Sequence, residues 1–245
     1  MTGAPILDNS MMYARYGEAR RDKRRAAITT ARSSTSSDVT IGPMGLGGML
    51  GMPKAPIGIV LFAHGSGSGR FSPRNNSVAG ALRKAGFATL LFDLLTDKEA
   101  EDRHNVFDIR LLAERLLMAT AWAKQEPETA ALSLCYFGAS TGAAAAFVAE
   151  AAAAWPVAAI VSRGGRPDLA RADLARVRAP TLLIVGGADP VVLDLNRAAL
   201  GELRCEKRLA IVPGATHLFE EPGALDTVVY LASGWFASHL AKVAS

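Results

Sequence analysis

The sequence predicts an α/β fold in which a mostly parallel, doubly wound sheet carries helices on both faces. Short apolar segments alternate along the chain with longer segments whose apolar residues recur at helical spacing. Several of the short segments, such as residues 57–63, are continuously apolar, which is typical of central parallel strands that are covered on both faces. Strands that alternate with helices form parallel sheets, because each crossover helix returns the chain to the same end of the sheet.

The first two predicted strands differ from those that follow. Residues 38–41 and 44–50 are short, the second of them is rich in glycine, and Gly42-Pro43 between them predicts a turn. We therefore expect two strands at the edge of the sheet. The later runs are more apolar and predict its centre. The predicted strands are residues 38–41, 44–50, 57–63, 87–92, 131–137, 157–161, 181–185 and 207–212.

Helical spacing is clearest in two segments. Val78 and Leu82 lie on one stripe of a segment that ends at Gly86, and residues 106–124 form a strongly amphipathic segment. The charged residues 97–104 before the second segment are expected to form a loop. The predicted helices are residues 76–86, 106–124, 141–153, 169–177, 193–203 and 224–243.

Composition favours a single domain of ordinary globular type. The 245 residues are 50% hydrophobic, which suits one domain with a sizeable core. Cys135 and Cys205 provide neither a disulfide framework nor the spacing of zinc ligands. No segment reaches the ~18 uninterrupted apolar residues of a membrane span, and the first residues lack an apolar leader. We therefore expect a cytoplasmic protein with no membrane partner.

The basic excess of the chain lies in residues 1–37. This segment holds seven Lys or Arg and three acidic residues, and subtracting these from the 27 basic and 23 acidic residues of the chain leaves 20 of each sign. A basic tail can contact nucleic acid, but no fold is predicted here that would present it. We expect a mobile extension over residues 1–37, one domain over residues 38–245, and no nucleic-acid partner.

Residues 138–142 read Gly-Ala-Ser-Thr-Gly and join a predicted buried strand to a predicted helix. This is the G-x-S-x-G pattern of a nucleophile elbow in its strand–turn–helix context. The turn is strained and crowded, so the residues two before and two after Ser140 must be tiny, as Gly138 and Gly142 are. A glycine-rich helix start that packs closely on a strand would give the same local pattern, so the rest of the chain must decide.

A serine nucleophile needs a base and an acid that orients the base. In parallel sheets, the polar groups that bind ligands lie just beyond the carboxyl ends of the strands. Of the four histidines only His217 follows the last strand, and Asp189 follows residues 181–185. The order Ser140, Asp189, His217 is that of α/β-hydrolase triads. The structural alternatives are a surface histidine and a helix N-cap at Asp189. Lesser acid candidates are Asp93, Asp194, Glu220 and Glu221.

A glycine-rich loop, residues 64–70, follows the strand at residues 57–63. Its backbone can approach a substrate closely, so we expect an oxyanion hole formed by the N–H groups of Thr141 and Ser66, with Gly65 as the alternative to Ser66. His64 is expected to fix this loop rather than to catalyse. The loop lacks the lysine of a P-loop and the spacing of a dinucleotide site, and no metal-ligand pattern is present, so neither cofactor nor metal is expected.

Four blocks of sequence resemble the dienelactone hydrolase-like branch of the α/β-hydrolases. They are residues 62–70, 138–142, 183–189 and 214–219, and the resemblance extends from about Asp38 to the C-terminus. It implies an α/β-hydrolase fold that cleaves an ester or a lactone. Dienelactone hydrolases use a cysteine nucleophile, whereas the matching residue here is Ser140. Members of the branch also occur fused to phosphoribosyltransferase domains, and we expect no such second domain in this chain.

Related hydrolases insert a cap between the strands that match residues 157–161 and 181–185. Only about twenty residues lie between them here, which is enough for one short helix. We expect an open site without a cap domain, and residues 97–106 are the remaining candidate for a cover.

Arg70, Arg163 and Arg166 fall in predicted loops at the catalytic edge. Surface ion pairing, for instance with Asp168, is the structural alternative. The functional hypothesis is that one or more of these guanidinium groups binds a carboxylate or phosphate of the substrate.

Together these residues predict a metal-free serine hydrolase that cleaves small ester, thioester or lactone bonds through an acyl-enzyme, with a preference for anionic substrates. A peptidase, or a non-catalytic binding or regulatory module on the same scaffold, are the alternatives. The expected partner is a small-molecule ester or lactone, and the expected state is a monomer or homodimer.

Overall fold

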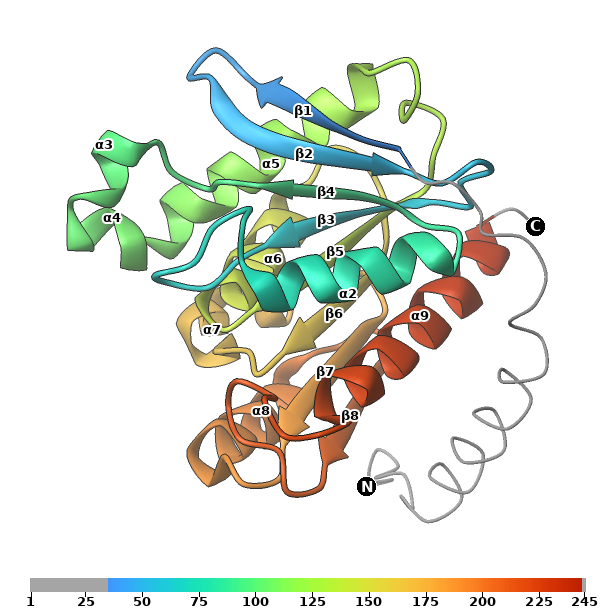
Figure 1. The fold of residues 1–245 in the computed structure, drawn as a ribbon. Helices are drawn as coiled ribbons and strands as arrows, with labels where there is room; N and C mark the ends of the chain where they lie inside the picture. The colour runs from blue at the N-terminus through green and yellow to red at the C-terminus, as the bar shows by residue number, and fades with distance from the viewer. Residues whose placement is uncertain (1–34, 244–245) are drawn as a thin grey trace.

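The computed structural model describes residues 35–243, in which one eight-stranded sheet is covered by helices on both faces (Figure 1). The strand order is β1-β2-β4-β3-β5-β6-β7-β8. β2 pairs antiparallel with β1 and with β4, and every other neighbouring pair is parallel. This is the mostly parallel, doubly wound sheet of an α/β-hydrolase. The strands are β1 (Thr35–Ile41), β2 (Leu46–Met52), β3 (Ile59–Ala63), β4 (Ala88–Phe92), β5 (Leu134–Ala139), β6 (Val157–Arg163), β7 (Thr181–Gly186) and β8 (Lys207–Val212).

The edge hairpin begins earlier than the sequence predicted. β1 starts at Thr35, where it pairs with Met52, so residues 35–37 belong to the sheet and not to the extension expected at residues 1–37. Because residues 35–37 are exposed Ser and Thr, this part of the strand has no apolar periodicity that would predict it. Residues 1–34, which hold the rest of that extension, lie outside the described residues.

Two layers of helices bury the two faces of the sheet (Figure 1). α2 and α9 pack on the face that carries Phe62 and Phe137, and α5, α6 and α8 pack on the face that carries Leu61 and Tyr136. α2 and α8 start three residues before their predicted limits, because Ser72 and Asp189 accept N-cap hydrogen bonds there. Their bounds are α2 Pro73–Lys84, α5 Ile109–Gln125, α6 Thr141–Ala152, α8 Pro190–Glu202 and α9 Ala224–Val243.

The segment expected to be a charged loop folds into two short helices, α3 (Asp97–Ala100) and α4 (Arg103–Phe107). Thr96 and Glu99 form a capping box at the start of α3, which the sequence T-x-x-E already signalled. Asp108 caps α5 by accepting from the Leu111 N–H at 3.0 Å, so α5 starts at Ile109 and not at residue 106. The N-cap at Asp108 thus separates α4 from α5, whereas apolar spacing predicted one continuous helix from residue 106.

The connection between β6 and β7 contains only a 3₁₀ turn, η1 (Pro167–Ala170), and a short helix, α7 (Arg171–Leu174). It has no room for a cap domain, as its length predicted. Among the residues that the structure describes, no helix is both long enough and apolar enough to cross a bilayer.

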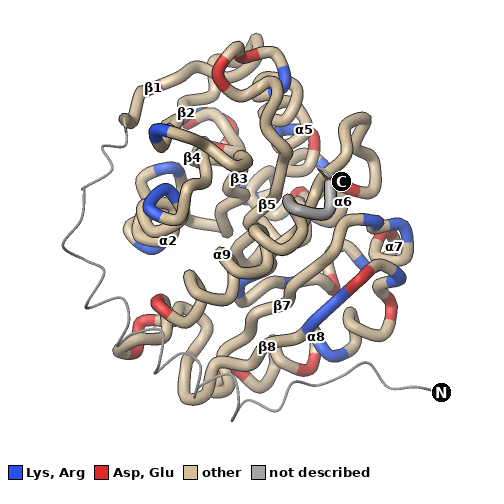
Figure 2. Tube along the Cα trace, turned by 90° about the vertical axis from the view of Figure 1, so that its right-hand side faces the viewer, with Lys and Arg blue, Asp and Glu red and all other residues tan. Residues whose placement is uncertain are grey.

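Charged residues lie mostly on the helices and loops around the sheet (Figure 2). In this view basic and acidic residues are interspersed along the described chain (Figure 2).

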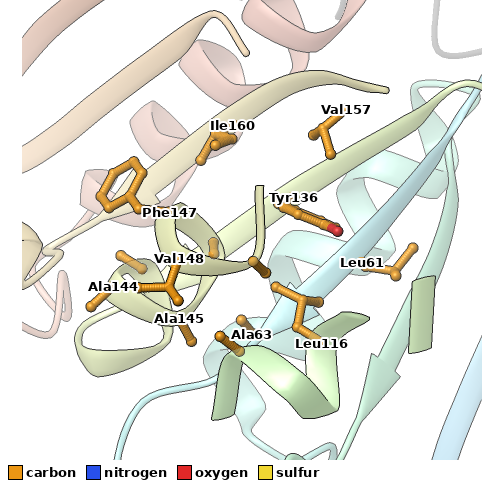
Figure 3. Packing of buried hydrophobic residues seen from close by; sticks show 14 of the residues in the cluster. Leu61, Ala63, Leu116, Tyr136, Ala144, Ala145, Phe147, Val148, Val157 and Ile160 are labelled. Atoms are coloured by element: carbon orange, nitrogen blue, oxygen red, sulfur yellow. The ribbon is translucent and has the colours of Figure 1, made fainter. Parts of the chain in front are cut away.

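Small side chains bring α6 close to the centre of the sheet (Figure 3). Ala144, Ala145 and Val148 are buried between α6 and the neighbouring elements. Tyr136 of β5 is the largest fully buried side chain in this layer, and its hydroxyl lies 2.7 Å from Thr120 Oγ1 of α5. Thr120 in turn donates to the Leu116 carbonyl oxygen at 2.9 Å, so the Tyr136 hydroxyl is the donor in this pair.

This chain of hydrogen bonds predicts an asymmetry between two substitutions. Thr120→Val leaves the buried Tyr136 hydroxyl without an acceptor and should lower the free energy of unfolding by about 1–3 kcal/mol. Tyr136→Phe leaves Thr120 bonded to Leu116 and should cost about 1 kcal/mol or less. Urea denaturation of both variants checks the order, and a larger loss in Tyr136→Phe would contradict the assigned hydrogen-bond direction.

Candidate active site

Ser140 lies at the junction of β5 and α6 with φ 52° and ψ −121°. Among the described residues, only Ser140 and Phe219 have positive φ without being glycine. The end of β6 holds this conformation, because the Ser140 N–H donates to the Arg163 carbonyl at 3.2 Å and the Ser140 carbonyl accepts from the Arg166 N–H at 3.1 Å. Backbone strain of this kind is typical of functional turns that their surroundings enforce.

The glycines that flank Ser140 allow the close packing of the turn. A Cβ on Gly142 would overlap the carbonyl oxygens of Ala63 and His64 at the end of β3, and a Cβ on Gly138 would overlap the backbone of Ala143. Because the atoms in the way are backbone, neither collision can be relieved by a side-chain rotation. The G-x-S-x-G pattern therefore has the steric origin that the sequence indicated.

His217 and Asp189 form the second part of the site. His217 Nδ1 lies 2.8 Å from Asp189 Oδ2, although 28 residues separate the two in the chain. The other oxygen, Asp189 Oδ1, accepts from the Val192 N–H at 3.4 Å, so Asp189 is also the N-cap of α8. Asp189 therefore acts both as the partner of His217 and as the N-cap of α8, because a different carboxylate oxygen makes each contact.

The end of β6 places Ser140 and His217 beside the same short backbone segment. The Arg163 carbonyl accepts from Ser140, and a Cβ on the next residue, Gly164, would lie 3.4 Å from His217 Nδ1. Ser140, His217 and Asp189 therefore gather at the carboxyl edge of the central strands.

The lesser acid candidates are engaged elsewhere. Asp93 pairs with Arg70, Asp194 with Arg197, and Glu220 with Arg74, while Glu221 accepts from the Thr216 N–H and hydroxyl. None of these contacts involves the His217 ring. The residues described also include no group of three or more His, Cys, Asp or Glu side chains placed to hold a metal ion.

The loop after β3 lies directly against the elbow, with one difference from expectation. The Ser66 N–H donates to Thr141 Oγ1 at 3.0 Å, so the amide expected in the oxyanion hole is already bound to a side chain. Gly65, the alternative donor, packs close to the nucleophile, since a Cβ there would lie 3.0 Å from Ser140 Cβ. The hydroxyl of Thr141 is a contact that sequence spacing could not reveal.

His64 connects this loop to the end of β4. Its Nδ1–H donates to the Gly65 carbonyl at 3.0 Å, and its Nε2 accepts from the Leu94 N–H at 3.1 Å. The acceptor role of Nε2 requires the neutral ring, and burial lowers the pKa of His64 below its ordinary 6.5. His64 therefore positions the loop, as the sequence predicted.

A pocket of about 510 Å³ opens beside the loop. Its apolar end is formed by Leu94, Leu95, Val106 and Leu112, and its polar side by the loop and the Arg70–Asp93 ion pair. α3 and α4 contribute Asp97, Ala100 and Val106 to its wall, so the segment expected to cover the site does border it.

The three candidate arginines differ in whether a carboxylate pairs with them. Arg70 pairs with Asp93, and Arg166 makes two hydrogen bonds to Asp168 at 2.9 and 2.7 Å. Arg163 is 8% exposed, and its Nε and Nη1 atoms have no hydrogen-bond partner among the described residues. Burial and, to a smaller extent, the nearby charge of Arg74 lower the pKa of Arg163 to about 10.

The packing of Gly142 predicts a large effect of one methyl group. Gly142→Ala should destabilise the protein by about 3 kcal/mol or more, because the backbone of β3 blocks the added Cβ. The matched control is Gly234→Ala in α9, where an added Cβ meets no atom within 4 Å, and it should stabilise by about 0.5–1 kcal/mol. Urea denaturation measures both, and a Gly142→Ala variant as stable as wild type would refute the steric account.

The environment of His64 predicts a loss of stability on acidification. Its pKa is lowered in the folded state, so the unfolded chain takes up the proton first and the free energy of unfolding falls as the pH drops below about 6.5. His64→Gln removes this titration and should flatten the dependence between pH 6.5 and 5. Equal slopes for wild type and variant in urea denaturation would show that His64 is not a source of this dependence.

Comparison with known proteins gives a consistent family. No family model matches the sequence. The crystal structure of a dienelactone hydrolase from Anabaena variabilis is 55% identical, with a TM-score of 0.80 over 84% of this chain and 98% of that one. Est1E from Butyrivibrio proteoclasticus, also solved with ferulic acid bound, has a TM-score of 0.72 at 16% identity over 84% of this chain and all of its own, and it supports the fold alone.

Two curated relatives, from two strains of Mycobacterium tuberculosis, carry the name "Putative phosphoribosyl transferase". They are 58% identical over 202 residues, which is 82% of this chain and 46% of theirs, so the chain spans about half the length of these relatives. The Anabaena structure is matched over nearly its whole length at an identity that defines a family. The chain therefore belongs to the dienelactone hydrolase-like family of α/β-hydrolases.

Proposed function

We propose that this protein is a serine hydrolase that cleaves small ester, thioester or lactone bonds through an acyl-enzyme. The observation that carries the proposal is the 2.8 Å contact of His217 Nδ1 with Asp189, at the sheet edge where Ser140 is held at positive φ. A buried strand, a strained serine, an oriented imidazole and a carboxylate on the far ring nitrogen are the parts that nucleophilic acyl transfer needs.

The first half of the proposed reaction forms the acyl-enzyme. His217 Nε2 takes the proton of the Ser140 hydroxyl as Oγ attacks the carbonyl carbon, and Asp189 stabilises the imidazolium through Nδ1–H. The negative charge on the former carbonyl oxygen is stabilised by the Thr141 N–H at the start of α6 and by a second amide of the loop after β3. His217 then returns the proton to the leaving oxygen or sulfur as its bond to carbon breaks.

Water completes the cycle. His217 removes a proton from the water as it attacks the acyl carbon, and the proton passes to Ser140 Oγ when the acid leaves. The second oxyanion donor is the Gly65 N–H, or the Ser66 N–H once Thr141 Oγ1 releases it. A change of partner at Thr141 couples the oxyanion hole to substrate binding, because a substrate oxygen and Thr141 Oγ1 would compete for the Ser66 amide.

The dimensions of the site favour a small substrate. Within residues 35–243 no cap domain is inserted between β6 and β7, and the pocket beside the loop has about 510 Å³ with an apolar end. This volume lies within the about 300–1,000 Å³ of small-molecule sites, which supports a small-molecule substrate.

The transferase name of the mycobacterial relatives is not carried over to this chain. The match covers 46% of their length, and we attribute the transferase activity in their name to the part that this chain does not match. The hydrolase parts described above all lie within residues 64–217, which argues for hydrolysis by this chain.

A fluorophosphonate probe tests the proposal. The wild-type protein should be labelled and Ser140→Ala should not, because the probe reacts with activated serine hydroxyls. Asp189→Asn keeps an N-cap for α8 but removes the carboxylate, so it should stay folded and lose about 10²–10⁴-fold in kcat on a small ester.

Three results would count against the proposal. A folded wild-type protein that resists labelling would favour a non-catalytic binding module. Equal labelling of Ser140→Ala would assign the nucleophile to another serine. A preference for amide over ester substrates of equal size would favour a peptidase.

A further inference from the structure

Asn196 is an unusual residue for the buried side of α8. The other buried residues of this helix, Val192, Leu193 and Ala199, are apolar, whereas Asn196 is fully buried and carries a polar amide. The amide oxygen, Oδ1, has no hydrogen-bond partner among the described residues. An unsatisfied buried oxygen costs free energy that an apolar side chain of similar size would not cost. Packing alone therefore does not explain an asparagine at this position.

The amide nitrogen of Asn196 connects α8 to the segment that follows β6. Nδ2 donates to the Val192 carbonyl of the same helix at 2.8 Å and to the Gly165 carbonyl at 2.9 Å. A carbonyl oxygen can only accept, so the nitrogen of the amide, and not Oδ1, must face these two groups. The bond to Val192 fixes the side chain on its own helix, and the bond to Gly165 reaches the backbone beside the proposed nucleophile.

The Gly165 carbonyl belongs to the same peptide unit as the Arg166 N–H. A peptide unit is planar, and its C=O and N–H point in opposite directions, so a hydrogen bond at one end orients the other end. The Arg166 N–H donates to the Ser140 carbonyl at 3.1 Å. A chain of hydrogen bonds thus runs from Asn196 through one peptide unit to the backbone of Ser140, and bonds in such a chain strengthen one another.

The conformation of Ser140 needs support of this kind. A residue with a side chain persists at positive φ only where its surroundings enforce that conformation. The Arg163 carbonyl, which accepts from the Ser140 N–H, belongs to β6 and is held by the pairing of that strand with β5 and β7. Arg166 lies beyond the end of β6, where the register of the sheet no longer orients the backbone. Asn196 supplies the support at this second contact.

The same helix also carries the proposed acid of the site. Asp189, whose carboxylate lies 2.8 Å from His217 Nδ1, is the N-cap of α8, and Asn196 lies about two turns further along. A helix keeps its residues at a fixed spacing. α8 therefore fixes the carboxylate that contacts the histidine relative to the amide that supports the serine.

We propose that Asn196 is a positioning residue for the nucleophile, which it holds in the attacking conformation through the peptide unit between Gly165 and Arg166. The proposal rests on the proposed hydrolase function and adds a residue that touches neither the substrate nor the reacting atoms. Loss of the bond to Gly165 frees this peptide unit and lets the Ser140 turn relax. A misplacement of about 1 Å at a reacting group can cost about 10²-fold in rate, so the effect belongs to the acylation step.

Asn196→Leu tests the proposal, because leucine has a similar volume and no hydrogen-bond donor. In single-turnover kinetics with 4-nitrophenyl butyrate, the acylation rate constant should fall about 10- to 100-fold. The ester concentration that gives half of the maximal rate should stay as in wild type, since the pocket is unchanged. The matched control is Thr120→Val, which also removes a buried hydrogen bond but lies on α5, and it should acylate at the wild-type rate.

Asn196→Asp distinguishes a hydrogen bond from packing. Burial raises the pKa of a carboxyl group, and the protonated form keeps one O–H donor for the Gly165 carbonyl, whereas the ionised form has none. The acylation rate of Asn196→Asp relative to wild type should therefore fall as the pH rises from about 6 to about 9. The relative rate of Asn196→Leu should not change with pH. If Asn196→Leu does not fold, the pH dependence of Asn196→Asp decides alone, and a constant relative rate would overturn the proposal.

Crystal structures separate failure of the positioning role from failure of the proposed function. In Asn196→Leu the Arg166 N–H and the Ser140 carbonyl should move beyond hydrogen-bonding distance, and in Thr120→Val they should stay bonded. A displaced Ser140 turn, found together with a wild type that does not hydrolyse esters, would keep the support by Asn196 and reject the hydrolase. Where wild type hydrolyses the ester, a folded Asn196→Leu that acylates at the wild-type rate, or whose Ser140 turn is undisturbed, would overturn the positioning role.

Discussion

The close contact between the start of α6 and the end of β3 is the constraint on which the site depends. Gly142 lies against the carbonyl oxygens of Ala63 and His64, at a distance that no residue with a side chain could reach. This contact brings the loop after β3 to the amino end of α6, where Ser66 meets Thr141. It also forces the chain between β5 and α6 into the strained turn that presents Ser140.

Neighbouring strands hold the strained turn in place. Two backbone partners of Ser140 come from this region, one from Arg163 at the end of β6 and one from Arg166 just beyond it. The same stretch passes close to His217 at Gly164, where an added Cβ would lie 3.4 Å from the ring, so the end of β6 lies beside both the serine and the histidine. Asp189, in the turn after β7, contacts the His217 ring and also caps α8, so one carboxylate positions both the imidazole and the start of a helix. The proposed triad is thus part of the same packing that stabilises the sheet.

Local rules were sufficient for most of the fold. β8 and α9 have the bounds that apolar spacing predicted, because an apolar run in one and amphipathic spacing in the other are strong signals. The elbow, Asp189 and His217 could be proposed because each follows a recognisable strand, and the structure brings Asp189 and His217 into contact. Apolar spacing did not predict α3, because this short helix has no buried residues. Its polar capping box, which is present in the sequence, is the signal that predicts it.

The rest depends on contacts between distant residues, which spacing does not encode. The Ser66 amide meets Thr141 across 75 positions of sequence, and this contact changes the expected oxyanion hole. Likewise, three arginines near one edge look equivalent in sequence, and only their carboxylate partners, or the lack of them, distinguish Arg163 from Arg70 and Arg166. Which charged groups form pairs depends on their neighbours in three dimensions, so the sequence alone does not predict it.

The most direct test of the central claim is detection of the covalent intermediate. The protein is mixed with an excess of a small activated ester, quenched in acid within milliseconds, digested and examined by mass spectrometry. The account predicts an added acyl group on the peptide that contains Ser140, formed and lost at rates compatible with turnover. Ester turnover with no acyl group on Ser140, or with the group on another residue, would contradict it.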